Sequence, residues 1–208
     1  VKVGCESDTY LKWYNAYDSF LKKNAGFLKA YPNVDSLTRK MGDVAYYYQG
    51  RVIENVRISN NIDVYAINGW EGMKQENHSG IVDDYRNLKG DPDLIAYYNQ
   101  PLYLAVKLNH KVLPVGDSTT ADVFIVNEKD VKGPATLNVK ATDDNGRVFF
   151  QRSVSVNITG GVRYGELLVK GLKFPVTKAG YSRVSAEITR NSKIVCTGSD
   201  KIYAVKFD

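Results

Sequence analysis

The residues with the clearest capacity for binding chemistry lie at the end of a short predicted strand. Residues 62–70 read IDVYAINGW, begin with β-branched residues, and are followed by Glu71. An indole ring can stack on the C–H face of a sugar, and a carboxylate or amide can hydrogen-bond sugar hydroxyls. Asn68, Trp70 and Glu71 are therefore candidate carbohydrate-binding residues. The alternative is that Trp70 covers a core and Glu71 is simply solvated.

The loop after this strand adds further hydrogen-bonding side chains. Residues 76–80 read ENHSG, so Asn77 and His78 could line the same site or lie on a surface loop. The chain has only two histidines, and its two cysteines, Cys5 and Cys196, lie near opposite ends. Zinc sites need closely spaced ligand pairs, and no phosphate-binding or dinucleotide motif is present. We therefore expect no metal and no cofactor.

Composition excludes several classes of protein. The 208 residues are 43 % hydrophobic and 25 % charged, as in a globular protein. The chain has 15 tyrosines, and most of the aromatic excess lies in its first half. The net charge of +5 comes from scattered basic residues, whereas a nucleic-acid binder concentrates them in a patch. No apolar run reaches the roughly 18 residues that a membrane-spanning helix needs. The chain opens without Met or a signal peptide, so we interpret it as a piece of a larger protein.

The first hundred residues show helical spacing. Aromatic and apolar residues recur every three or four positions over 10–21 and again over 37–56. A shorter helix is expected over 91–99, where an Asp-Pro pair provides a favourable start. Because the aromatic residues of 10–21 follow the spacing of one helix face, we assign most of them to packing.

One strand among helices leaves two interpretations of the first half open. It is either a helical domain with an isolated strand or the terminal part of a (β/α)8 barrel. We favour the barrel, because a strand that follows a helix through a tight turn is typical of parallel sheets. The carboxyl ends of barrel strands face the active site, which is where Trp70 and Glu71 would lie.

The second half changes to the period of two that is typical of strands. Apolar and polar residues alternate over 137–141, 154–158 and 184–188. Turn signals recur every 8 to 15 residues, and Asn145-Gly146 is a strong hairpin signal. Seven or eight short strands predict an immunoglobulin-like β-sandwich. The predicted fold class is thus an α/β segment over 1–100 followed by an all-β sandwich over 101–208.

Several segments, taken in order, resemble glycoside hydrolase family 2, which contains β-galactosidases, β-glucuronidases and β-mannosidases. Residues 41–43, Met-Gly-Asp, are similar to the family's Met-Gly-Asn segment after barrel strand seven. Residues 66–71 are similar to its final barrel strand, and 79–83 with Arg86 are similar to its Asn-Gly-Leu-Val…Asp-Arg segment. Residues 102–208 then resemble the immunoglobulin-like domain that follows the barrel.

The resemblance implies a parent enzyme that cleaves β-glycosidic bonds in oligo- or polysaccharides. Such retaining enzymes use an acid that protonates the leaving oxygen and a carboxylate, about 5 Å away, that attacks the sugar. The acid would lie on a barrel strand outside this chain. The nucleophile would stand five residues before Met41, where this sequence has Ser36 in place of Glu. Asp35 is adjacent and Glu6 is the nearest upstream Glu, so we assign no catalytic residue and expect the fragment alone to be inactive.

The resemblance also implies roles for the binding residues and the partners. Trp70 would contact the sugar, with Glu71 as its polar neighbour. The expected partners are a carbohydrate substrate and the remainder of the parent enzyme, in the periplasm or outside the cell. Two alternatives stay open: a non-catalytic carbohydrate-binding or adhesion module on the same scaffold, and a purely structural interaction module.

Overall fold

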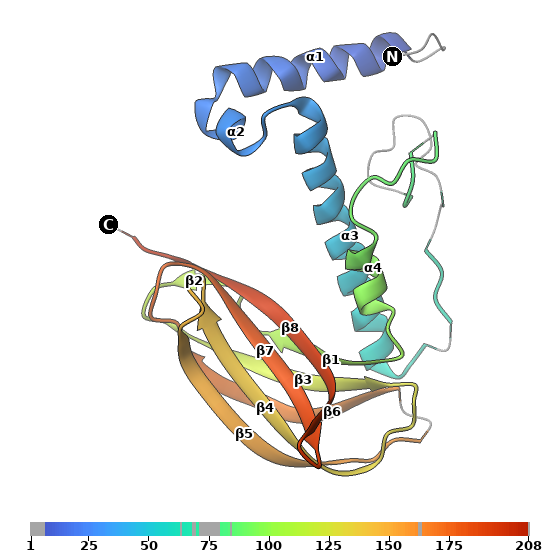
Figure 1. The fold of residues 1–208 in the computed structure, drawn as a ribbon, viewed down its shortest axis with the longest axis vertical. Helices are drawn as coiled ribbons and strands as arrows, with labels where there is room; N and C mark the ends of the chain where they lie inside the picture. The colour runs from blue at the N-terminus through green and yellow to red at the C-terminus, as the bar shows by residue number, and fades with distance from the viewer. Residues whose placement is uncertain are drawn as a thin grey trace. The chain divides into compact units, whose positions relative to one another are not determined.

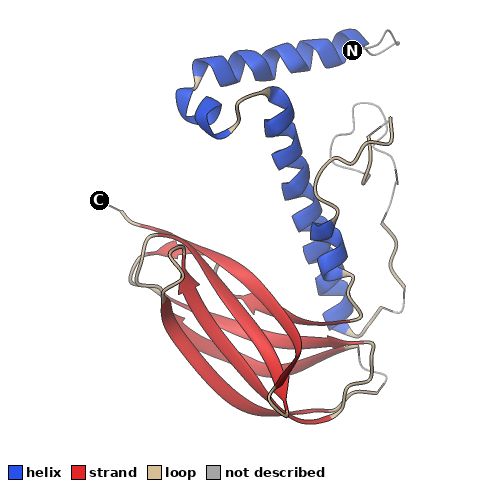
Figure 2. Ribbon diagram, viewed as in Figure 1, coloured by secondary structure: helices blue, strands red, loops and turns tan. Residues whose placement is uncertain are grey.

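The chain folds into two compact units. The computed structural model describes residues 7–62, 64–67, 70, 80–83, 85–161 and 164–207. One unit comprises Val1–Ile53 and Val64–Asn99, and the other comprises Glu54–Asp63 and Gln100–Asp208. Figure 2 shows that the strands belong to the second unit, whereas the described elements of the first are helices. The predicted domain boundary at residue 100 stays a prediction, and the end of one long helix groups with the strands.

Three of the four described helices form close to where the sequence predicts them, whereas the short helix α2 (Ala25–Ala30) was not predicted. The others are α1 (Ser7–Lys23), α3 (Val34–Ser59) and α4 (Asp93–Tyr98) (Figure 1). Asn24 separates α1 from α2. Asn60 follows α3 with φ 55°, the left-handed conformation that commonly ends a helix.

The predicted barrel portion is wrong for the described residues. Ile62, residues 64–67 and Trp70 form no strand. Within the described part of 7–99, β pairing is limited to an isolated bridge between Val82 and Leu88. A strand of a parallel sheet takes its backbone hydrogen bonds from neighbouring strands. The described helical unit supplies no such neighbour, so its apolar segment stays irregular.

The prediction of a β-sandwich is confirmed. Two sheets are present, with strand orders β1-β3-β6 and β2-β8-β7-β4-β5. All pairs are antiparallel except β2 with β8. The strands are β1 (Leu102–Leu108), β2 (Val112–Pro114), β3 (Ser118–Asn127), β4 (Gly133–Asp143), β5 (Val148–Ile158), β6 (Gly165–Pro175), β7 (Gly180–Arg190) and β8 (Lys193–Val205).

Alternating side chains build the core between the two sheets. Val123 and Ile125 of β3 face Leu137 of β4 and Val184 of β7 within one cluster, and all four are fully buried. This follows from the two-residue period of a strand, which sends every second side chain to one face. The β4–β5 hairpin turns where Asn145-Gly146 predicted it, with Gly146 at φ 80°.

The two sheets also approach each other closely at one edge. A Cβ added to Gly198 of β8 would lie only 1.7 Å from the carbonyl oxygen of Leu104 in β1. At the end of β8, the short strand β2 pairs with residues 203–205. β2 thus lies on the side of β8 that faces away from β7, whereas Gly198, opposite buried Ala186, faces the other sheet.

The carboxyl end of α3 belongs to the sandwich unit through specific polar contacts. The Arg57 guanidinium lies 2.6 Å from a carboxylate oxygen of Glu128 and 5.4 Å from the ring centre of Tyr103. The side chain of Asn60 accepts a hydrogen bond of 2.9 Å from the backbone N–H of Gly165. Because the Arg57 side chain is buried, this ion pair fixes the helix end against the strands.

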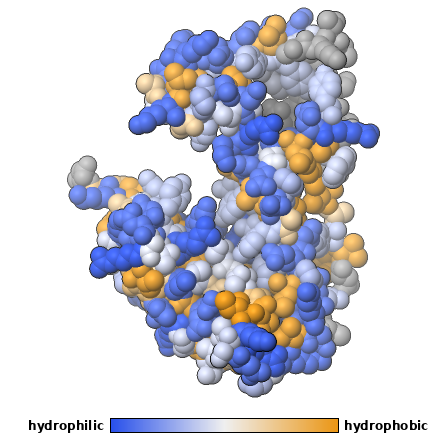
Figure 3. Space-filling model, in the orientation of Figure 1, coloured by the Kyte–Doolittle hydropathy of each residue, from blue (hydrophilic) through white to orange (hydrophobic). Residues whose placement is uncertain are grey.

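The surface in Figure 3 carries hydrophilic and hydrophobic side chains interspersed over both units. Among the helices of the described ranges, none combines the length and apolar character needed to cross a membrane. Three or more potential metal ligands do not gather anywhere in the described part of the chain.

Candidate functional site

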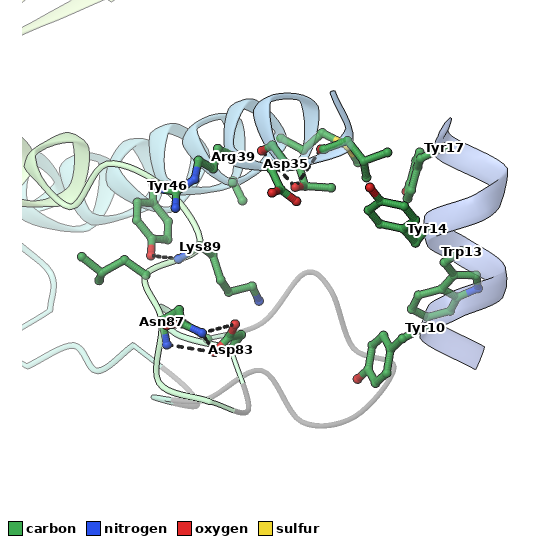
Figure 4. Close-up of a pocket in the computed structure, with 17 residues that line it drawn as sticks. Tyr10, Trp13, Tyr14, Tyr17, Asp35, Arg39, Tyr46, Asp83, Asn87 and Lys89 are labelled. Atoms are coloured by element: carbon green, nitrogen blue, oxygen red, sulfur yellow. Dashed lines mark hydrogen bonds between the residues drawn. The ribbon is translucent and has the colours of Figure 1, made fainter. Parts of the chain in front are cut away.

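A pocket of about 700 Å³ lies within the helical unit. Figure 4 shows one wall made by α1 and another made by the start of α3 and residues 80–89. The wall residues with functional side chains are Tyr10, Trp13, Tyr14, Tyr17, Asp35, Thr38, Arg39, Tyr46, Asp83, Asn87 and Lys89.

The α1 wall is aromatic because of the spacing of its residues. Tyr10, Trp13, Tyr14 and Tyr17 stand at i, i+3, i+4 and i+7, which places them on one face of a helix. Tyr10 and Trp13 pack edge to face with their ring centres 5.7 Å apart. Tyr14 keeps 46 % of its surface exposed. The aromatic residues of α1 therefore line the pocket and also pack against one another.

The start of α3 is fixed by a reciprocal cap. The side-chain oxygen of Asn33 accepts the backbone N–H of Ser36 at 2.8 Å, and the Ser36 hydroxyl accepts the backbone N–H of Asn33 at 3.3 Å. This is the hydrogen-bonding pattern of a capping box, which satisfies N–H groups that a helix start leaves without partners. The cap sets the first turns of α3, from which Asp35 and Arg39 line the pocket.

Residues 80–83 and 85–89 form a turn that is stabilised by hydrogen bonds within it. A carboxylate oxygen of Asp83 accepts the backbone N–H groups of Tyr85 and Asn87 at 2.9 and 2.8 Å. The Asn87 amide also donates to the other oxygen of Asp83 at 3.0 Å. Asp83 thus shapes the turn, which leaves Asn87 and Lys89 on the pocket wall.

Buried Tyr46 joins this turn to α3. Its hydroxyl accepts the backbone N–H of Lys89 at 3.1 Å and donates to the carbonyl of Ile81. Next to it, a Cβ on Gly42 would lie 1.7 Å from the carbonyl oxygen of Lys89, so only glycine permits this approach. The side chain of Asp43 accepts the backbone N–H of Asp91 at 2.8 Å. The Met-Gly-Asp segment therefore has a structural task here.

Charges on the pocket wall are balanced. Asp35 and Asp83 are acidic, whereas Arg39 and Lys89 are basic. Ligand pockets commonly combine apolar or aromatic walls with a few polar groups that orient the ligand. Rings on one side with amide, carboxylate and cationic groups on the other suit a polyhydroxylated ligand such as a sugar.

The structure describes only one of the five predicted site residues. Trp70 is 60 % exposed, and its backbone carbonyl accepts the N–H groups of Ile81 and Val82 at 2.9 and 3.1 Å. Its ring is not part of the pocket wall. The other four lie outside the described residues; they are Asn68, Glu71, Asn77 and His78. Their binding role stays a prediction.

Sequence reasoning missed the aromatic face of α1 as a candidate site. It assigned these residues to packing from their helical spacing alone. The composition of that face could have indicated a site. It bears four aromatic rings, three of them with a hydroxyl, whereas a face used only for packing would favour aliphatic residues.

Comparisons with known proteins reveal distant likenesses only. No protein-family model and no curated protein matches the chain. A glycosyl hydrolase family 2 member from Bacteroides cellulosilyticus is similar over 50 % of this chain and 15 % of its own, with 14 % identity and a TM-score of 0.39. A β-glucuronidase from glycoside hydrolase family 2 is similar over 49 % and 11 %, with 16 % identity and a TM-score of 0.38.

A CARDB domain of a Pyrococcus furiosus protein, solved with di-metal ions, is similar over 51 % of this chain and 96 % of its own, with 18 % identity and a TM-score of 0.36. The similar structures thus include glycosidases and a CARDB domain. The chain spans only a small part of the glycosidases, so their activities remain statements about those proteins.

Proposed function

We propose that the chain is the C-terminal part of a glycosidase that cleaves β-glycosidic bonds, and that its helical unit binds carbohydrate. The observation that carries the binding role is the pocket between the aromatic face of α1 and the polar wall of α3 and residues 80–89. The order of the three family-like segments supports the glycosidase parent.

The polar wall can orient a sugar in a defined way. Asp35 accepts hydrogen bonds from hydroxyls, while Arg39 and Lys89 only donate. Asn87 can donate and accept. A sugar that stacks on Trp13 or Tyr14 would therefore meet both donors and acceptors across the pocket.

The catalytic pair belongs, in this proposal, to a part of the parent outside this chain. A retaining glycosidase needs two carboxyl groups about 5 Å apart. Position 36, where the resemblance calls for the nucleophile, holds a serine whose hydroxyl and N–H both serve the helix cap. Binding without hydrolysis is thus the expected property of the chain alone, and its parent is expected in the periplasm or outside the cell.

Intrinsic fluorescence tests the binding role, because the chain has two tryptophans. Trp13 lines the pocket, whereas Trp70, the residue predicted from the sequence, lies outside it. We expect β-linked galacto-, manno- or glucurono-oligosaccharides to change the emission of the chain and of Trp70→Phe, but not that of Trp13→Phe. A response lost only in Trp70→Phe would move the site to the sequence-predicted residues. No response in any of the three proteins would contradict carbohydrate binding at either tryptophan.

Aryl β-glycosides test the catalytic part of the proposal. We expect no release of the aryl group above the background of a heat-denatured sample. Turnover by this chain would contradict a catalytic pair located elsewhere.

A non-catalytic carbohydrate-binding or adhesion module is the second candidate. The capping role of Ser36 favours it, since a serine in this position cannot act as the carboxylate nucleophile. The two candidates predict the same binding but differ in the parent protein, which hydrolyses β-glycosides only under the first.

A further inference from the structure

The outer face of the five-stranded sheet carries an exposed pair of tyrosines. Tyr181 of β7 stands directly opposite Tyr203 of β8, and these strands lie side by side in Figure 1. Their ring centres are 4.8 Å apart, and 63 % of Tyr181 and 41 % of Tyr203 are exposed. Val112 of β2 extends the same row with 66 % exposure. The exposed side chains of Tyr181, Tyr203 and Val112 thus form a largely apolar patch on the sheet, which we call the platform.

Two cations face each other one row further along the same face. Arg183 stands opposite Lys201, two residues from the tyrosines on each strand, and both are exposed. In the described part of the chain neither forms an ion pair, and Arg183 donates only a long hydrogen bond of 3.5 Å to the Ser199 hydroxyl. Like charges directly opposite each other destabilise a sheet, so this pair costs stability that an anionic ligand would restore.

The next rows supply hydroxyl and amide groups. Ser185 stands between Ser199 and Lys140, and Asn138 stands between Glu187 and Ser153. Glu187 is the acidic residue of these rows, and its carboxylate accepts from the Asn138 amide at 3.4 Å.

Two acidic residues at the end of the sheet near the tyrosines share one cation. The Lys178 ammonium lies 3.1 Å from Asp143 and 2.9 Å from Asp144. The outward-facing rows themselves carry three exposed cations, Arg183, Lys201 and Lys140, against the carboxylate of Glu187, so their net charge is positive.

We propose that this face binds a polysaccharide built of uronic acids. The tyrosine rings stack on pyranose rings, the Arg183 fork pairs with a carboxylate in two-point geometry, and the rows of hydroxyls bond sugar hydroxyls. Rows on one face of a strand are about 7 Å apart, which lets a ring on the platform place its carboxylate at the cations. A few cations spread over separate rows match sparse carboxylates better than the dense charge of a sulfated glycan or a nucleic acid. The face is separate from the helical pocket and its binding does not depend on the proposed glycosidase.

Calorimetric titration of the whole chain with polygalacturonate tests this proposal. We expect Arg183→Gln/Lys201→Gln to weaken binding by about tenfold or more, because charge-assisted hydrogen bonds are lost. Lys170→Gln/Lys173→Gln is the matched control, since it removes the same charge from exposed positions of β6 in the other sheet. It should change the affinity less than twofold. Equal losses in the two double variants would overturn the proposal in favour of nonspecific charge attraction.

A second arm tests the platform. We expect Tyr181→Ala to weaken binding severalfold while Tyr164→Ala, another exposed tyrosine of the sandwich unit, does not. Circular dichroism confirms that both variants fold. Neutral β-galactan, chondroitin sulfate and a single-stranded oligonucleotide should bind more weakly than polygalacturonate. Absence of polygalacturonate binding, or tighter binding of any of the three, would overturn the proposal.

Discussion

The sandwich and the helical unit hold themselves together by different means. The sandwich buries one continuous cluster of side chains, many with no exposed surface, between its sheets. The helical unit leaves large apolar residues such as Met41, Val44 and Tyr48 about half exposed or more. Its order comes instead from close backbone approach at Gly42 and from hydrogen bonds of Tyr46 and Asp43. The order of the helical unit thus depends on a small number of contacts, so we expect single substitutions at these contacts to disturb it locally.

Each unit has its own spectroscopic or chemical probe. Trp13 and Trp70 both belong to the helical unit, so their fluorescence reports its unfolding. Cys196 is buried in the sandwich, and burial raises the pKa of its thiol to about 12. In a Cys5→Ser background, labelling of the Cys196 thiol therefore reports opening of the sandwich, because the thiolate is the reactive form.

The largest effect is expected in the sandwich core. Leu137→Ala removes a fully buried side chain from β4 and should lower the free energy of unfolding by about 2–5 kcal/mol. Leu11→Ala in α1, where 46 % of the residue is exposed, should cost less than about 0.5 kcal/mol. Urea titration with Cys196 labelling and tryptophan fluorescence measures both. Similar costs at the two positions would contradict the difference between the units.

Gly42 is the sharpest test of the helical unit. Alanine in a helix interior normally stabilises by about 1 kcal/mol relative to glycine. At Gly42 the added Cβ meets the Lys89 carbonyl, so we expect a net loss of about 1–3 kcal/mol, detected by tryptophan fluorescence. Gly26→Ala in α2 is the control, because a Cβ there meets nothing within 4 Å. If Gly42→Ala and Gly26→Ala both stabilise the protein, the close approach of Gly42 to the Lys89 carbonyl does not contribute to stability.

Tyr46→Phe should have a smaller but measurable effect. It removes the hydroxyl that bonds Ile81 and Lys89 from a residue only 1 % exposed. A loss of about 0.5–1.5 kcal/mol is expected, because one buried hydrogen-bonding partner is lost while the Lys89 N–H and the Ile81 carbonyl still bond each other at 3.3 Å. Tyr48→Phe, on a residue 64 % exposed, should be neutral. Hydrogen exchange of the Lys89 amide provides the measurement, and unchanged protection in Tyr46→Phe would be inconsistent with this contact.

The smallest effect is a pH dependence at the β4–β5 turn of the sandwich. The backbone N–H of Arg147, followed by the Lys178 ammonium, holds the pKa of Asp143 below its usual value against the opposing effect of burial. Because the pKa of Asp143 is lower in the folded than in the unfolded state, the carboxylate stabilises the folded protein at pH values above the unfolded-state pKa of about 4. This stabilisation is lost as the pH falls through the folded-state pKa. Asp143→Asn should therefore lose stability near neutral pH and show a shallower decline below about pH 4. Urea midpoints from pH 2 to 7 measure this, and parallel curves would exclude the contribution.

The strands of the sandwich were largely predictable because residues close together in the sequence determine which face is buried and where the chain turns. Alternation over 137–141 and 184–188 directly encodes which face is buried, and Asn145-Gly146 encodes the turn. Strand order was not predictable, since it depends on pairings between distant segments such as β2 with β8.

The helical unit was predictable only in its helices. Residues 62–70 have the composition of a strand, but a strand forms only where other strands complete its hydrogen bonds, and composition does not say whether they exist. The pocket was missed for a related reason. The spacing of Tyr10 to Tyr17 shows that they share a face, whereas what lies opposite that face depends on how α1, α3 and residues 80–89 come together.

The edge of β8 has a consequence for the behaviour of the protein at high concentration. An unpaired strand edge is a template for adding a strand from another molecule. Here β2 occupies one end of that edge, and the close approach of Gly198 to Leu104 brings β8 against β1 of the other sheet. Since a Cβ at position 198 would clash with the Leu104 carbonyl and force the sheets apart, we expect substitution of Gly198 to leave the edge of β8 open to other molecules. Replacement of Gly198 by valine should be recognised first by aggregation in light scattering, at protein concentrations where the unaltered chain stays monodisperse.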